Sequence, residues 1–241
     1  MNPFTKAIYG FPLLGGMVRG ARLSWTRWLS PFHDSASYWE RRYVGGGSSG
    51  EGSYGRLAEF KAEVINQIVA EEGISSVIEW GSGDGNQLSL ANYESYIGLD
   101  VSQAAIAQCR RRFAGDRTKS FTHLEPNVLN QLAGSLHAEL ALSLDVIYHL
   151  VEDNLFESYM QSLFNSARRF VLIYSSNQEL AAELPHVRHR RFDTWIAAHR
   201  PDWTLVRHVR NRYPQRYAHE PETSRADFYL YRISQQPKQH A

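Results

Sequence analysis

Apolar residues along this chain follow two alternating patterns. Short continuous apolar runs, such as Leu140–Leu144, are typical of strands that are buried on both faces of a sheet. Between them lie longer segments in which apolar residues recur every three or four positions, which is the period of an amphipathic helix. Strands are expected at residues 75–80, 96–100, 119–125, 140–144, 170–174, 203–209 and 226–233, and helices at residues 35–43, 56–72, 86–91, 103–113, 154–167 and 192–199.

This alternation predicts an α/β fold of the Rossmann-like, doubly wound kind, with a mostly parallel sheet and helices on both faces. A helical and loop segment precedes it as an N-terminal extension. The chain is divided into an arm of residues 1–36, a domain of residues 37–233 and a polar tail of residues 234–241. In the helix of residues 56–72, Lys61 is assigned to the polar side with Glu59, Glu63 and Gln67. Arg168 and Arg169 are expected to close the helix of residues 154–167, because positive charge suits the negative end of a helix.

Three glycines at alternate positions follow the first strand, in the sequence Glu79-Trp80-Gly81-Ser82-Gly83-Asp84-Gly85-Asn86. Glycine lets a backbone turn sharply and approach a ligand without a Cβ atom in the way. A loop at the carboxyl end of a strand is where open α/β sheets bind nucleotides. The dinucleotide fingerprint G-x-G-x-x-G would need a third glycine at position 86, where Asn86 stands. Free backbone N–H groups at the start of the following helix are expected to face the ligand.

Acidic residues close several of the expected strands. Asp100 ends the second strand, 21 residues after Glu79. A carboxylate at that place accepts hydrogen bonds from both ribose hydroxyls in nucleotide-binding α/β domains. Asp100 or Ser102 is equally placed to cap the following helix. Glu125 closes the third strand and Asp145 the fourth, so the acids gather at one edge of the predicted sheet.

The segment Glu79–Gly85 resembles motif I of the class I S-adenosylmethionine-dependent methyltransferases, and Leu142–His149 resembles their motif IV. The resemblance covers residues 37–233. It implies a seven-stranded sheet closed by a late hairpin, binding of S-adenosyl-L-methionine and transfer of its methyl group. The cofactor-binding residues that it implies are Glu79, Gly81, Gly83, Gly85, Asp100, Val101, Glu125, Asp145, Tyr38 and Trp39.

The residues at the end of the fourth strand, Asp145, Tyr148 and His149, are the candidates for catalysis. The sulfonium is an activated donor, so rate comes from aligning the acceptor with the methyl group and excluding water. An acceptor hydroxyl or protonated amine also needs a base. His149 is the candidate, because the unperturbed pKa of histidine is near 6.5. The alternative is a structural histidine packed beside Leu150.

A stretch rich in glycine and serine, residues 45–55, follows the segment Tyr38-Trp39-Glu40-Arg41-Arg42-Tyr43. That segment resembles the Y-W-x-x-R-Y sequence that many small-molecule methyltransferases place over the cofactor. The stretch is interpreted either as a loop that covers the ligand or as a flexible linker.

Composition and missing motifs narrow the function. The chain has 241 residues and a formal net charge of +1, which gives no global attraction for nucleic acid. The single Cys109 is expected to be a core residue and fits a reducing, cytoplasmic compartment. No cysteine and histidine cluster has the spacing of a zinc site, and no metal is expected. The sequence has neither an N-P-P-Y or D-P-P-Y tetrapeptide nor a P-C motif. These absences favour a small molecule or a glycan sugar as acceptor over a nucleobase.

Two basic segments leave alternatives open. Residues 1–34 mix arginine with apolar and aromatic residues, which predicts either peripheral contact with an anionic membrane or an irregular arm or leader. Residues 184–217 contain eight Arg, four His and two Asp. These arginines either recognise an anionic acceptor or pair and pack within the domain. Two further classes of function stay open: a nicotinamide-dependent oxidoreductase, and a non-catalytic nucleotide-binding or membrane-associated module. The oligomeric state is not predicted.

Overall fold

A computed structural model describes residues 32–125, 135–181, 184–217 and 220–234. The chain divides into two compact units, Met1–His33 and Asp34–Ala241. The predicted membrane contact of residues 1–34 falls almost wholly outside the described residues, as does nearly all of the expected polar tail.

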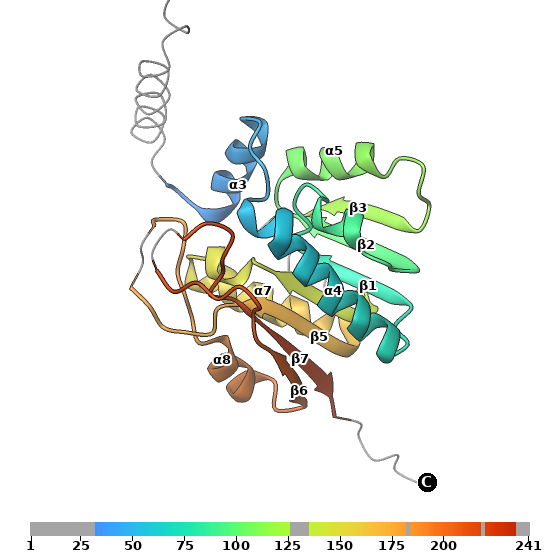
Figure 1. Cartoon of the computed structure of the whole chain (residues 1–241), viewed down its shortest axis with the longest axis vertical. Helices are drawn as coiled ribbons and strands as arrows, with labels where there is room; N and C mark the ends of the chain where they lie inside the picture. Colours follow the sequence, from blue (N-terminus) through green and yellow to red (C-terminus); the bar gives the residue numbers. More distant parts are fainter. Residues whose placement is uncertain (1–31, 126–134, 182–183, 218–219, 235–241) are drawn as a thin grey trace, which may run out of the picture. The chain divides into compact units, whose positions relative to one another are not determined.

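Seven strands form one sheet in the order β3-β2-β1-β4-β5-β7-β6 (Figure 1). Strands β1 to β5 pair in parallel, and β7 lies antiparallel between β5 and β6. This confirms the predicted doubly wound, mostly parallel sheet and its late hairpin. The strands are β1 (Ser76–Trp80), β2 (Ser95–Asp100), β3 (Lys119–His123), β4 (Ala138–Leu144), β5 (Ala167–Ser175), β6 (Trp203–Val209) and β7 (Asp227–Ile233).

Helices cover both faces of the sheet. Helices α4 (Gly55–Glu71) and α5 (Gln103–Arg112) contribute to one apolar core, and α7 (Asp153–Asn165) and α8 (Phe192–His199) contribute to the other. Strand β4 shows why the apolar runs are continuous. Leu140 and Leu142 belong to the α4 side and Ala141 to the α7 side, and all three are fully buried.

The structure corrects the ends of two expected elements and the type of a third. Helix α7 ends at Asn165, so Arg168 and Arg169 belong to β5 and do not close the helix. The segment from Ala167 onward pairs with β4 instead, and the Arg169 guanidinium lies 2.8 Å from the Glu139 carboxylate of that strand. Strand β3 ends at His123, before Glu125. The helix expected at residues 86–91 is the short 3₁₀ turn η2 (Gln87–Leu90).

The N-terminal extension contains helix α3 (Ser35–Val44), which Asp34 caps by accepting a hydrogen bond from the Ser37 N–H. Helix α3 is tied to the rest of the domain at its first residue and at its middle. The Ser35 N–H donates to Glu152 Oε1 at 2.9 Å, and Glu40 Oε2 accepts from Ser102 Oγ at 2.6 Å. Because Glu152 precedes α7 and Ser102 precedes α5, α3 bridges the carboxyl-terminal edge of the sheet.

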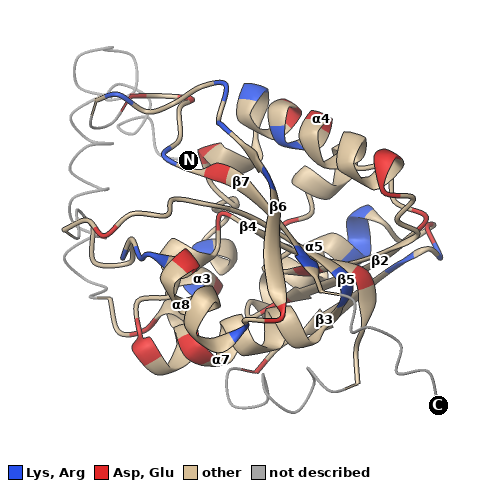
Figure 2. Ribbon diagram, turned by 90° about the horizontal axis from the view of Figure 1, so that it is seen from below, with Lys and Arg blue, Asp and Glu red and all other residues tan. Residues whose placement is uncertain are grey.

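Acidic and basic positions are interspersed over the domain (Figure 2). The Arg-rich segment follows this pattern. The guanidinium of Arg190 lies 2.6 Å from the Asp153 carboxylate, and that of Arg212 bonds both oxygens of Glu63. These pairs favour the structural interpretation of that segment. Every helix among the described residues is too short or too polar to cross a bilayer.

Candidate functional site

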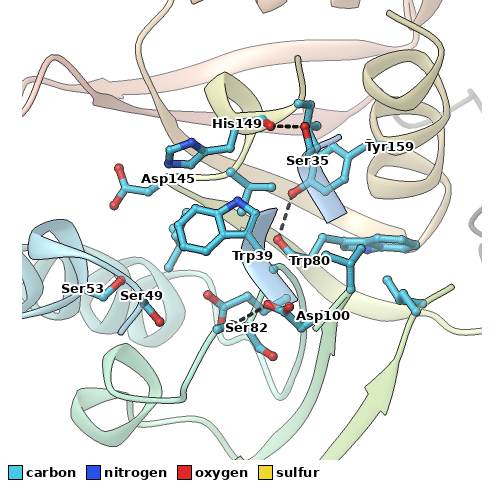
Figure 3. A pocket seen from close by; sticks show the side chains of 18 of the residues that line it. Ser35, Trp39, Ser49, Ser53, Trp80, Ser82, Asp100, Asp145, His149 and Tyr159 are labelled. Carbon is cyan, nitrogen blue, oxygen red and sulfur yellow. Dashed lines mark hydrogen bonds between the residues drawn. The ribbon is translucent and has the colours of Figure 1, made fainter. Parts of the chain in front are cut away.

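A cavity opens at the carboxyl-terminal ends of β1, β2 and β4, under α3 (Figure 3). This is the point where the strand order reverses, since β1 has β2 on one side and β4 on the other. The cavity holds about 940 Å³, counting its mouth toward solvent. It is lined by Ser35, Ala36, Trp39, Tyr43, Ser49, Ser53, Lys61, Glu79, Trp80, Gly81, Ser82, Gly83, Gln87, Asp100, Val101, Leu124, Leu144, Asp145, Val146, His149, Leu150, Leu155 and Tyr159.

The glycine loop has the sharp turns that its sequence predicts. Gly81, Gly83 and Gly85 have φ angles of +90°, +56° and +74°, which disfavour any residue with a side chain. The space that a Cβ would need is occupied by protein atoms. A Cβ on Gly81 would lie 2.4 Å from Val146 Cγ2, and one on Gly83 would lie 2.4 Å from Ser49 Oγ. These glycines are therefore required by close packing within the protein, in addition to any need for a ligand to approach the backbone.

The backbone N–H groups of this loop are already used. Those of Gly81 and Ser82 donate to Leu99 O, and that of Gly83 donates to the Asp100 carboxylate. The next three N–H groups, from Asp84 to Asn86, donate to Ser49 Oγ, Ser82 O and Asp84 Oδ1 respectively. Among the N–H groups expected to be free at the start of the helix at residues 86–91, that of Asn86 is therefore not free. The loop thus offers no cradle of N–H donors for a pyrophosphate.

Asp100 lies buried at the end of β2 and lines the cavity. Each carboxylate oxygen accepts one backbone N–H at 2.8 Å, from Gly83 and from Ser102. Burial raises the pKa of Asp100 to about 6, and these two hydrogen bonds oppose that shift. A carboxylate oxygen has two lone pairs, so both oxygens keep the capacity to accept a ligand hydroxyl. Ser102 Oγ caps α5, so Asp100 is free of the capping role.

Glu79, on β1, is the second buried acid that lines the cavity. Its Oε2 accepts a hydrogen bond of 2.5 Å from the Tyr96 hydroxyl. Burial raises the pKa of Glu79 to about 7, although the bond from Tyr96 and the charge of Lys61 lower it. A ligand cation beside Glu79 would favour its ionised form.

Asp145 follows β4 with a φ angle of +60°, an unusual conformation for a residue with a side chain. Two partners hold its carboxylate. Lys61 Nζ lies 2.7 Å from Oδ2, and the Tyr148 hydroxyl donates to Oδ1 at 2.8 Å. A strained backbone that its surroundings hold in place is typical of functional sites.

Lys61 corrects the sequence-based assignment of α4. The side chain is not on the polar side but fully buried, and it lines the cavity. Lys61 lies four residues after Leu57 and four before Ile65, both of which are buried, so its spacing does place it on the apolar face. This helical spacing could have predicted that Lys61 is buried, but its charge led to the opposite assignment.

His149 lies in the 3₁₀ turn η4 (Ile147–His149) and lines the cavity. Its Nδ1 is 3.0 Å from the carbonyl oxygen of His186. A carbonyl only accepts, so Nδ1 carries the proton and the neutral ring keeps its lone pair on Nε2. Burial lowers the pKa of His149 to about 4, so the ring is neutral at physiological pH. The Trp39 ring meets it edge-on, with the ring centroids 4.8 Å apart.

The loop of residues 45–54, here called the lid loop, is fastened to the glycine loop. Asp84 Oδ2 accepts hydrogen bonds from the Ser49 N–H at 2.9 Å and from the Tyr54 hydroxyl at 2.8 Å. Asn86 Nδ2 donates to Ser53 O at 2.8 Å. A flexible linker would not make this set of bonds, so the structure favours the interpretation as a covering loop.

Two polar atoms on the cavity wall have no hydrogen-bond partner among the described residues. They are Ser82 Oγ and Gln87 Oε1, and both are buried. Gln87 Nε2 donates to Ala58 O at 3.1 Å, which fixes the orientation of its amide. Buried polar atoms without partners are costly, and a bound ligand is a common way to satisfy them.

The structure brings most of the predicted residues into one cavity, but not all. Glu79, Gly81, Gly83, Asp100, Val101, Asp145, Trp39 and His149 line it. Tyr148 contributes indirectly, through Asp145. Gly85 faces Phe113 and Cys109, Glu125 is exposed, and Tyr38 stacks on the His186 ring. Lys61, Gln87, Ser82 and Leu124 are lining residues that the sequence did not single out. Within the described residues, no group of three or more His, Cys, Asp or Glu is placed to hold a metal ion.

No protein-family model matches the chain, and no curated protein matches it. Solved structures do match. The N-methyltransferase NodS from Bradyrhizobium japonicum WM9 in complex with S-adenosyl-L-homocysteine is 14% identical, with a TM-score of 0.67 over 84% of this chain and 100% of that one. Magnesium protoporphyrin IX methyltransferase (ChlM) from Synechocystis PCC 6803 with bound S-adenosyl-L-homocysteine is 14% identical, with a TM-score of 0.58 over 83% and 95%.

The methyltransferase domain of a bacterial Hen1 is 19% identical, with a TM-score of 0.56 over 73% of this chain and 97% of that one. At these identities the likeness establishes the fold. The chain has the fold of the class I methyltransferases, as the resemblance of its motifs predicted.

Proposed function

We propose that this protein is a class I S-adenosyl-L-methionine-dependent methyltransferase that acts on a small molecule or on a sugar of a glycan. The observation that carries the proposal is the buried Asp100 carboxylate in a cavity at the strand-order reversal of this fold. NodS and ChlM, which share the fold, have structures with S-adenosyl-L-homocysteine bound.

The residues of the cavity fit such a cofactor. Asp100 keeps lone pairs for two ribose hydroxyls, and Val101 and Leu124 give an apolar wall for a base next to it. Ser82 Oγ and Gln87 Oε1 are polar atoms that still need partners. When bound, S-adenosylmethionine supplies an activated methyl group on a sulfonium. The protein then has to orient the acceptor and exclude water.

His149 would accept a proton from the acceptor. The hydrogen bond from Nδ1 to His186 O holds the ring and leaves the lone pair on Nε2. Because burial lowers its pKa to about 4, the ring is unprotonated at neutral pH, and it would hold the accepted proton only weakly before passing it on. Helix α3 and the lid loop would exclude water, since Trp39 and Ser49 lie on the cavity wall.

The charges of the cavity favour an uncharged acceptor over an anionic one. Glu79, Asp100 and Asp145 are acidic, and Lys61 is the basic side chain among the described lining residues. No arginine of residues 184–217 is among those lining residues, and several of these arginines pair with carboxylates elsewhere. The walls near His149 include Trp39, Leu150 and Leu155, which suit an acceptor with an apolar face.

The nicotinamide-dependent alternative is less well supported. Pyrophosphates bind to free N–H groups at the start of a helix. Here the N–H groups of residues 81–86 are all used, and the loop leads into a short 3₁₀ turn.

Isothermal titration calorimetry of the full chain tests the proposal. We expect S-adenosyl-L-homocysteine to bind with a Kd on the order of micromolar and NAD and NADP to give no binding heat. Saturable binding of NAD or NADP, with no response to S-adenosyl-L-homocysteine, would replace the proposed activity with that of an oxidoreductase.

A further inference from the structure

The buried Lys61 has a role that its ion pair alone does not explain. Its ammonium carries three N–H donors, and the described residues give it one hydrogen bond, to Asp145 Oδ2 at 2.7 Å. The ammonium also lies over the Tyr174 ring, 5.2 Å from its centroid. Its side chain is 1% exposed, yet it borders the cavity. Two of its donors therefore remain for a ligand.

Stability is a weak reason for such a pair. Removing two charges from water costs about as much as their attraction returns, and apolar residues of similar size often serve the fold equally well. A charged pair on a cavity wall is better explained by what the cavity holds.

The two ends of the cavity differ in chemistry. Figure 3 shows Asp100 and Asp145 on different sides of Trp39. The Asp100 end, with Val101 and Leu124, suits a nucleoside. The other end carries Lys61 and Asp145, and the Glu79 carboxylate is close enough to both Lys61 and Asp100 to interact electrostatically with each. Gln87 belongs to this end, because its amide donates to Ala58 O, one turn before Lys61 on α4.

An amino-acid group carries both an ammonium and a carboxylate, and this end offers a partner for each. Glu79, Asp145 and Gln87 Oε1 are acceptors for an ammonium. A carboxylate needs N–H donors, and those of the glycine loop from Gly81 to Asn86 are all used. Among the described lining residues, Lys61 is the cation that remains.

We propose that Lys61 binds the carboxylate of the methyl donor's amino-acid end, while Glu79, Asp145 and Gln87 receive its ammonium. This inference rests on the proposed function. It assigns a donor-binding role to a residue of α4, outside the glycine loop and outside the strand ends.

Two ligands separate the amino-acid end from the rest of the donor. S-adenosyl-L-homocysteine has that end, whereas 5′-methylthioadenosine lacks it and keeps the nucleoside and the sulfur. We expect the substitution Lys61→Met to weaken binding of S-adenosyl-L-homocysteine by about 10- to 100-fold, which is the range for a charge-assisted hydrogen bond. Binding of 5′-methylthioadenosine should change by less than about twofold, because it does not reach Lys61. Calorimetric titration measures both affinities.

Two further variants serve as controls for the Lys61→Met measurement. Lys61→Met leaves the Asp145 carboxylate without its cation, so the double variant Lys61→Met/Asp145→Asn, which removes both charges, is titrated as well. It should lose at least as much affinity for S-adenosyl-L-homocysteine, because it also removes a proposed partner of the ammonium, and it should keep its affinity for 5′-methylthioadenosine. Lys119→Met removes a lysine paired with Asp116 at the amino-terminal end of the edge strand β3, opposite the strand ends that form the cavity, and should leave both affinities unchanged. Equal losses for the two ligands, or unchanged affinity for S-adenosyl-L-homocysteine, would overturn the role of Lys61. Failure of the unaltered protein to bind either ligand would instead overturn the proposed function and with it the inference.

Discussion

Asp100 combines two tasks in one carboxylate. It holds the glycine loop through the Gly83 N–H and the start of α5 through the Ser102 N–H, and it lines the cavity. A ligand hydroxyl that binds there depends on the ionised form. In the proposed function, the same residue links the shape of the loop to binding of the ribose.

Replacing Asp100 with alanine should weaken binding of S-adenosyl-L-homocysteine by about 1–3 kcal/mol, which is the usual loss for a hydrogen bond to a charged group. Binding to the unaltered protein should also weaken as the pH falls from about 7 through about 6, because the Glu79 and Asp100 carboxylates, whose pKa values burial raises to about 7 and about 6, then take up protons. Calorimetric titration across pH measures both effects. An unchanged affinity in Asp100→Ala would remove this residue from the site.

The proposed role of His149 can be tested without knowing the acceptor substrate. Its ring should be the neutral tautomer with the proton on Nδ1 at pH 7, and it should titrate at a pKa of about 4, because burial disfavours the charged ring. Imidazole ¹⁵N chemical shifts across pH report both properties. A titration near 6.5, or a proton on Nε2, would contradict the proposed base.

At the scale of elements, the glycine loop and the lid loop form one packed unit. The Ser49 hydroxyl accepts the Asp84 N–H, and it lies 2.9 Å from the Tyr43 hydroxyl. Both groups occupy the space where a Cβ on Gly83 would sit. The glycine loop and the lid loop are therefore held in place by the same contacts.

The substitution Gly83→Ala should lower the free energy of unfolding by about 2 kcal/mol, because it adds a strained φ angle and a clash with Ser49. Gly115→Ala is the matched control. Gly115 is exposed and no atom lies within 4 Å of its added Cβ, so the change should stay within about 0.5 kcal/mol. Chemical denaturation measures both. Equal stability of the two variants would contradict the packing of the lid loop on Gly83.

The periodic elements were predictable from the sequence because burial dictates their pattern. Strand β6 and helix α8 have the expected ends, and Asp100 and Asp145 close their strands as expected. Lys61 was assigned to the wrong side because its charge outweighed its helical spacing. The bonds of the lid loop join Ser49 to Asp84, 35 residues away, and no local pattern encodes such a pairing.

At the scale of the whole molecule, the N-terminal residues pose a separate question from the cavity. Membrane contact through residues 1–34 and cytoplasmic localisation stay predictions from the sequence. The mixture of arginine with Trp25 and Trp28 favours an anionic interface.

We expect the full chain to float with vesicles that contain anionic lipid and to stay behind with neutral ones. A chain lacking residues 1–33 should not float with either, and it keeps Asp34, the cap of α3. Flotation in a density gradient measures this. Equal behaviour of the two chains would dismiss the N-terminal residues as a membrane element.

The central claim is that the cavity at the carboxyl ends of β1, β2 and β4 binds the methyl donor. A crystal structure with S-adenosyl-L-homocysteine bound tests it most directly. We expect ribose hydroxyls within hydrogen-bond distance of Asp100 and the amino-acid end beside Lys61 and Glu79. A nucleoside bound elsewhere, or a ribose that does not contact Asp100, would contradict it.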